Sequence, residues 1–125
     1  MEIQWLSNGL KGSVSIYETN ITLNTVAASN FEKSFAVLVG INKYDKTLII
    51  KSLNKEEATS GVYSKNDLHQ ISIKPSYGRI NGKNIIRGIC SIFPLDFDSK
   101  KLYKYNCHWD GASKSLIVNL EEELL

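Results

Sequence analysis

Apolar and polar residues alternate in several short stretches of this chain, and that alternation is typical of strands that bury one face. One such stretch covers residues 14–16 and is followed by the polar letters YETN and by a second stretch that ends at Asn24. The same order returns at residues 71–73, where a turn with the letters KPSYG leads to a stretch that ends at Asn81. An asparagine side chain accepts hydrogen bonds from the free amides at a helix start, so Asn24 and Asn81 are each predicted to cap a helix.

These stretches belong to an internal repeat. A shift of 57 residues lays VSIYETNITLN (14–24) over ISIKPSYGRIN (71–81), and six of the eleven positions are identical or similar. Further on, KTLIIKSL (46–53) resembles KSLIVNL (114–120) at a shift of 68, which requires an insertion of eleven residues, placed within CSIFPLDFDSKK. Two matches in the same order indicate an ancient duplication.

Each half also predicts a helix and a hairpin. Residues 82–93, GKNIIRGICSIF, place isoleucines at helical spacing, and the shorter TVAASNFEKS holds the equivalent place in the first half. Apolar arms joined by polar turns predict hairpins over residues 35–53 and 102–120. The linker NKEEATSG has Asn54 and Glu57 at the spacing of a capping box, which predicts one short capped helix.

The predicted fold class is mainly β with short helices. One copy of about 55 residues would leave strand edges and an apolar face uncovered. Two copies that exchange hairpins would cover both and close a small barrel. We therefore expect one domain, 1–125, built from two pseudo-repeats at about 12–54 and 69–121 that form a swapped-hairpin barrel. The terminal letters EEELL are expected to form a helix or a frayed end.

Composition and cysteine usage limit the classes of function. The chain is 42% hydrophobic and 22% charged, as in ordinary globular proteins. It has no apolar run of membrane-spanning length and no secretion signal at its start, so we expect a cytoplasmic protein without a membrane partner. Cys90 and Cys107 lack metal-site spacing, and no carboxylate pair or phosphate loop stands out, which predicts no metal, no cofactor and no catalysis. A Cys/His nucleophile, for example with His108 or His69, stays open as an alternative.

The charge is distributed unevenly. Residues 1–62 carry six basic and six acidic side chains, whereas residues 63–120 carry nine basic and four acidic ones. The two arginines of the protein, Arg79 and Arg87, both lie in the second half. This asymmetry indicates an anionic partner for the second half.

The letters YGRINGKNIIRGI, followed by a hairpin, resemble the AbrB/SpoVT-type swapped-hairpin family of bacterial transcription factors, which includes MazE-like antitoxins. The resemblance rests on Gly78-Arg79 and on Arg87 eight residues later. Two such units in one chain resemble the tandem arrangement of MraZ-type proteins. The first copy has Ile21-Thr22 where Gly-Arg is expected, so the resemblance implies an arginine site in the second copy alone.

The resemblance implies a transcriptional regulator that binds duplex DNA without catalysis. Basic side chains would neutralise phosphates and reach base edges, and the tyrosine would stack or pack against a sugar. Because one intact site per chain would bind weakly, we also expect a homo-oligomer that presents several sites together. The implied DNA-binding residues are Arg79, Lys83, Arg87, Lys74 and Tyr77.

Two alternatives accompany this interpretation. Arg79 could form an internal ion pair with Asp96 or Asp98, and the helix cations could form a solvated face. The protein could then be an interaction or assembly module, antitoxin-like or phage-related, with a protein partner in place of DNA. An exposed strip of Tyr103 and Tyr105 would favour this second function.

Overall fold

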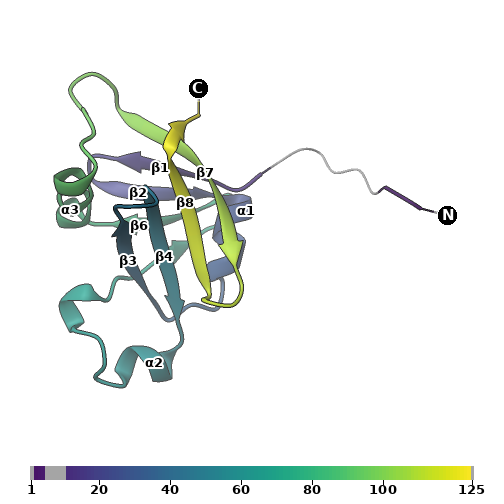
Figure 1. The fold of residues 1–125 in the computed structure, drawn as a ribbon. Coiled ribbons are helices and arrows are strands. Elements are labelled where there is room, and N and C mark those ends of the chain that lie inside the picture. The colour runs from purple at the N-terminus through teal and green to yellow at the C-terminus, as the bar shows by residue number, and fades with distance from the viewer. Residues whose placement is uncertain (1, 5–10, 125) are drawn as a thin grey trace.

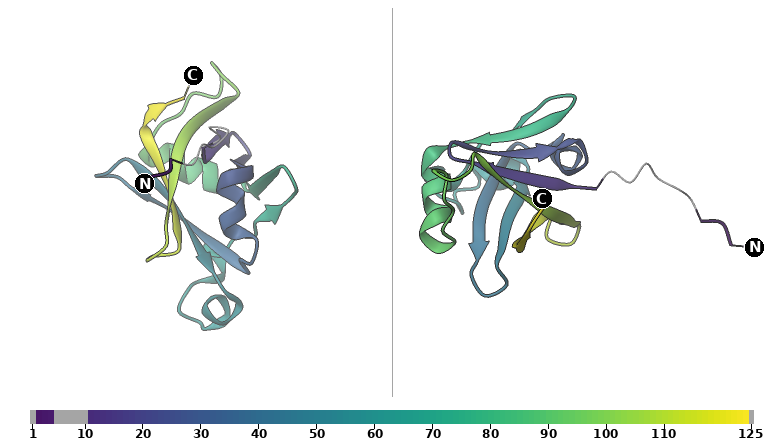
Figure 2. Two further views of the ribbon diagram at one scale, coloured as in Figure 1. Left: turned by 90° about the vertical axis from the view of Figure 1, so that its right-hand side faces the viewer. Right: turned by 90° about the horizontal axis from the view of Figure 1, so that it is seen from above.

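The computed structural model describes residues 2–4 and 11–124, and its main feature is one antiparallel sheet that curls around the core (Figures 1 and 2). The eight strands lie in the order β3-β4-β8-β7-β1-β2-β6-β5. The strands are β1 Ser13–Tyr17, β2 Asn20–Asn24, β3 Ala36–Asn42, β4 Thr47–Leu53, β5 Ser72–Ile73, β6 Tyr77–Asn81, β7 Leu102–Asp110 and β8 Ser115–Glu123. The helices are α1 Thr25–Ala28, α2 Lys55–Thr59 and α3 Lys83–Ile92, with 3₁₀ turns at Ser29–Phe31 and Lys65–Asp67. The predicted fold class, mainly β with short helices, is confirmed.

The register of the sheet follows the sequence repeat. Strands β2 and β6 pair so that Thr22 faces Arg79, and these positions are related by the shift of 57. Strands β4 and β8 pair so that Ile49 faces Ile117, and these are related by the shift of 68. Equivalent residues of two halves face one another when a local twofold axis passes between them, so each half completes the sheet of the other.

The two hairpin turns repeat the same backbone detail. Lys46 and Lys114 both have a positive φ, 52° and 53°, at positions related by the shift of 68. The Ser52 amide donates to the Lys114 carbonyl, and the Leu120 amide donates to the Lys46 carbonyl, each at 2.9 Å. Each hairpin is therefore tied to the turn of the other by the same hydrogen bond.

The core lies inside the curl of the sheet. Alternate residues of the strands point inward, and the outward positions between them are mainly polar. Phe31 and the α3 residues Ile86 and Ile89 close the core on the helical side. The strand residues that are at most 1% exposed are Val14, Ile16, Ile21, Leu23, Val37, Leu48, Ile50, Leu53, Ile80, Leu116 and Val118.

Two of the three predicted helix caps are confirmed. The side chain of Asn24 accepts the amide of the third residue of α1 at 3.0 Å. Asn54 and Glu57 form a reciprocal capping box at the start of α2. The prediction for Asn81 is wrong, because that residue is still paired within the sheet and Gly82 precedes α3 without a side-chain cap.

The prediction for the C-terminal letters EEELL is also wrong for residues 121–123, while Leu125 lies outside the described residues. They continue strand β8 as far as Glu123, past a bulge in its pairing with β7. Glu123 forms an ion pair with Lys100, and the Leu124 amide donates to the Lys104 carbonyl at 2.7 Å. Pairing with the neighbouring strand thus decides the conformation of this segment.

The two ends of the strand order almost meet. Val37 of β3 and His69, just before β5, exchange two backbone hydrogen bonds of 2.9 Å. Beyond this bridge, β3 continues through Val39 and Ile41 beside α3. The barrel is consequently open along that part of β3.

Candidate nucleic-acid interface

The Gly-Arg pair lies in a strand, whereas the sequence pattern predicted that Gly78 belongs to the turn KPSYG. The turn between β5 and β6 is confined to residues 74–76, so Gly78 and Arg79 are both part of β6. Gly78 is buried, and a Cβ at this position would lie 3.1 Å from both Ala28 Cβ and Ile73 Cδ1. The glycine therefore lets β6 pack against α1, while Arg79 occupies the next, outward position.

Arg79 is held by two neutral neighbours. Its Cζ atom lies 4.8 Å from the ring centroid of Tyr77, which is a cation–π geometry. Its Nε atom donates a long hydrogen bond of 3.5 Å to Thr22 Oγ1 on the facing strand. Arg79 is partly buried as a residue, and its charge is oriented by contacts that do not neutralise it.

The alternative in which Arg79 pairs with an internal carboxylate is wrong. Across residues 2–4 and 11–124, the ion pair within 4 Å is Lys100–Glu123. The Asp96 carboxylate instead accepts the amides of Asp98 and Ser99 within its own loop. The positive charge of Arg79 is therefore available to a ligand.

Arg79 belongs to a polar row that crosses five strands on the outer face. The register places Lys104 opposite Ser15, Ser15 opposite Thr22, Thr22 opposite Arg79, and Arg79 opposite Ser72. Strand spacing of about 4.8 Å puts the Cα atoms of Lys104 and Arg79 about 14 Å apart along a flat sheet. We call these five residues the outer row. Its small hydroxyl side chains leave the two cations accessible to an extended anion.

Lys104 is not among the residues that the sequence predicted for this site. The outer row brings it near Arg79 only because β1 lies between β7 and β2. The alternation of the stretch after residue 101 predicts that Lys104 points outward, but the order of strands is needed to find its neighbours.

Lys83 and Arg87 form a second cluster, on α3. They are exposed and four residues apart, and they line a hollow of about 330 Å³ together with Glu18 and Thr19 of the β1–β2 turn. The Gly82 amide donates to the Thr19 carbonyl at 3.0 Å, which fixes the helix start against this turn. Glu18 puts a negative charge on the same wall, so the net charge of this hollow is about +1.

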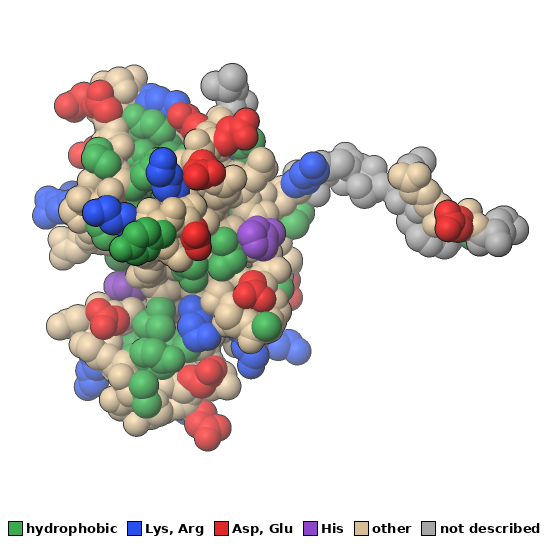
Figure 3. All heavy atoms as spheres, in the orientation of Figure 1, with side chains coloured by type: hydrophobic (Ala, Val, Ile, Leu, Met, Phe, Trp, Pro, Cys, Tyr) green, Lys and Arg blue, Asp and Glu red, His purple; other side chains and the backbone are tan. Residues whose placement is uncertain are grey.

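Lys74 lies at the opposite end of β6 from α3. Its side chain is exposed, and its amide donates to the Tyr77 carbonyl at 2.8 Å across the tight turn. Arg79 thus lies against Tyr77, and Lys83 and Arg87 line one hollow. Lys74 lies apart from both pairs, in the turn before β6. In the view of Figure 3, basic and acidic side chains are interspersed without one large basic patch.

The tyrosines of β7 do not form an exposed strip. Tyr105 is 2% exposed in the core, and burial raises its pKa to about 12. The Tyr103 hydroxyl donates to the Asp96 carbonyl and accepts the Asp96 amide, each at 2.9 Å. The observation that would favour the assembly module over DNA binding is therefore not found.

The thiol chemistry is unfavourable to a Cys/His nucleophile. Burial raises the pKa of Cys107 to about 11, so its thiol is protonated at neutral pH. Cys90 and Cys107 are both free. The described part of the chain contains no group of three or more metal-ligating side chains.

Comparisons with known proteins identify no family for this chain. No protein-family model, curated protein or solved structure matches it. The resemblance to the AbrB-type family therefore stays a prediction that rests on the residues quoted above. Within residues 2–4 and 11–124, no helix has both the length and the apolar character needed to cross a membrane.

Proposed function

We propose that this protein is a cytoplasmic, non-catalytic transcriptional regulator that binds duplex DNA through the outer face of β2 and β6 and the start of α3. The observation that carries the proposal is Arg79, a partly buried residue whose guanidinium is oriented by Tyr77 and Thr22 without a carboxylate partner in the described chain. An oriented cation is suited to bidentate contacts with a phosphate or with the N7 and O6 atoms of guanine.

The other cations have a positioning role in this proposal. Lys83, Arg87 and Lys74 would contact phosphates, which fix register and orientation but carry no sequence information. Lys104 joins them on the outer row, where hydroxyl side chains can hydrogen-bond to phosphate oxygens. Strands that present side chains to DNA are an established mode of recognition.

The number of cations sets the expected strength of binding. Five phosphate contacts, one for each of these cations including Arg79, give a slope of about −4.5 in log affinity against log salt concentration. A single set of contacts of this size binds weakly at physiological salt. We propose that a homo-oligomer presents several such faces and so raises the affinity.

The test is a fluorescence-anisotropy titration with duplex DNA at two salt concentrations. Arg79→Gln should weaken binding about tenfold and reduce the salt slope by about 0.9, because one phosphate contact is lost. Arg87→Gln should reduce the slope in the same way. Lys55→Gln, which removes one exposed charge from α2, is the matched control and should change neither value. Absence of binding at low salt, or equal effects of Lys55→Gln and Arg79→Gln, would reject the proposal.

A further inference from the structure

The open edge of β3 is a second surface with a structural character of its own. Strand β3 pairs with β4 on one side, and on the other side it meets the chain at the bridge between Val37 and His69. The residues that follow the bridge along β3 lie at one end of the strand order. This edge is separate from the outer face of β2 and β6 that carries Arg79.

The edge presents free backbone hydrogen-bonding groups. The Val37 amide and carbonyl bond to His69, so they point away from β4. Because the direction of these groups alternates along an antiparallel strand, the amides and carbonyls of Val39 and Ile41 point to the same side. Within the described chain, no backbone or side-chain group bonds to them there. Val39 and Ile41 therefore offer two amide donors and two carbonyl acceptors, spaced as a neighbouring strand would need them.

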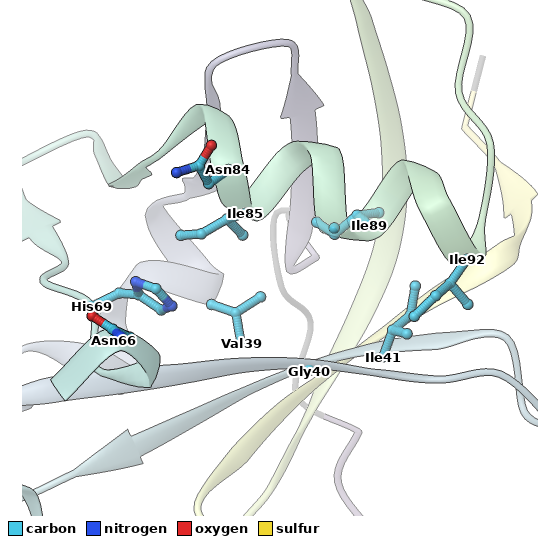
Figure 4. Close-up of a pocket in the computed structure, with 10 residues that line it drawn as sticks. Val39, Gly40, Ile41, Asn66, His69, Asn84, Ile85, Ile89 and Ile92 are labelled. Atoms are coloured by element: carbon cyan, nitrogen blue, oxygen red, sulfur yellow. The ribbon is translucent and has the colours of Figure 1, made fainter. Parts of the chain in front are cut away.

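A hollow lies on each side of this edge. On the concave side, a hollow of about 410 Å³ separates β3 from α3, and Figure 4 shows Ile85, Ile89 and Ile92 projecting toward Val39 and Ile41. Its lining contains no charged carboxylate, lysine or arginine.

On the convex side, a hollow of about 380 Å³ is lined by Leu38, Gly40, Tyr63 and Lys51 among others. Val39, Gly40 and His69 line both hollows, so the two are continuous around the edge of the strand. Side chains of an added strand would point alternately into one hollow and into the other.

The edge also lacks the usual protection against strand addition. Residues 38–42 read LVGIN and include no charge and no proline, the residues that commonly guard an edge. A Cβ built on Gly40 would meet no atom within 4 Å, so the space beside it is open. Ile92, on the wall of the concave hollow, is 46% exposed.

We propose that the edge of β3 binds an extended peptide segment of a partner protein by strand addition. The backbone of the peptide would bond to Val39 and Ile41. Side chains facing α3 would be uncharged and apolar, and the alternate ones could be polar because Lys51 and Asp67 line the other hollow. The walls formed by α3 and by the 3₁₀ turn Lys65–Asp67 suit a single strand better than the edge of a second folded sheet.

Amide hydrogen exchange measured by NMR tests the edge directly. In the protein alone, the amides of Val39 and Ile41 should exchange much faster than those of Leu38 and Gly40, which bond to β4. Addition of the synthetic peptide KTITVTIK, acetylated and amidated, should slow exchange at Val39 and Ile41. Protection of these two amides without peptide would overturn the proposal, and a dimer mass by light scattering would then assign the edge to a second copy.

Variants and modified peptides complete the test. Gly40→Lys puts a long charged side chain into the open convex hollow and should weaken binding of KTITVTIK at least about tenfold. Tyr44→Lys, at a 96% exposed position of the same hairpin, adds the same charge outside the groove and should leave the affinity unchanged. N-methylation of the peptide amides that bond to β3 should abolish binding. N-methylation of the amides between them, which point away from β3, should leave binding unchanged. No binding of the unmodified peptide, or equal effects of the two variants, would overturn the proposal.

Discussion

The pairing of Thr22 with Arg79 allows a gain-of-function prediction. Thr22 is the position equivalent to Arg79 in the first half, and the two side chains face each other across β2 and β6. Thr22→Arg would put a second guanidinium next to the first on the outer row. We expect this change to lower stability slightly and to strengthen the binding of duplex DNA.

Both magnitudes follow from the geometry. Two guanidinium groups about 6 Å apart at the solvent-exposed face repel by about 0.7 kcal/mol. That repulsion should lower the melting temperature by about 3 °C in a protein of this size. One further phosphate contact steepens the salt slope by about 0.9, which corresponds to roughly eightfold tighter binding at 0.1 M salt.

The assay compares Thr22→Arg with two controls by fluorescence anisotropy and thermal unfolding. Thr22→Gln adds length without charge and should leave the salt slope unchanged. Thr59→Arg adds the same charge at an exposed position of α2, away from the outer row. If Thr22→Arg binds DNA no more tightly than Thr59→Arg does, the outer face of β2 and β6 is not the binding surface.

Three further predictions concern stability and reactivity. Gly12→Ala should lower the free energy of unfolding measured in urea, because its Cβ would lie 3.0 Å from Cys107 Sγ, whereas Gly40→Ala meets open space and should be neutral. Burial lowers the pKa of His69, so the unfolded chain takes up a proton more readily, and stability should fall as the pH drops below 6.5. His69→Asn should remove this loss of stability, which amounts to at most about 1.4 kcal/mol per pH unit. His108→Asn is the control and should show the same loss as the unchanged protein. Cys107 should react with iodoacetamide at pH 8 far more slowly in the folded protein than in urea, as followed by peptide mass spectrometry, and equal rates would contradict its raised pKa.

The fold class could be predicted from the repeat, because the apolar positions recur in the same order in both halves of the chain. The shifts of 57 and 68 residues reappear as the pairs Thr22–Arg79 and Ile49–Ile117. Local signals failed where pairing between distant strands decides the outcome. Asn81 has the chemistry of a cap, yet it remains in the sheet opposite Asn20.

The candidate site was predicted only in part for a similar reason. Arg79 and Tyr77 are close in the sequence, and so are Lys83 and Arg87, so their association could be foreseen. Lys104 joins the outer row through the order of strands, which no local pattern reveals. The open edge of β3 was not predicted at all, because an apolar alternating stretch looks the same whether or not a neighbour covers it.

The interleaving of the halves has a consequence for dissecting the molecule. Strand β2 bonds to β6 and β4 bonds to β8, whereas the connection around α2 and residues 60–64 is mostly exposed. A protease cut in that connection would therefore produce two fragments that stay associated as a heterodimer and separate only on denaturation. Neither fragment, expressed by itself, would have a finished core to fold around.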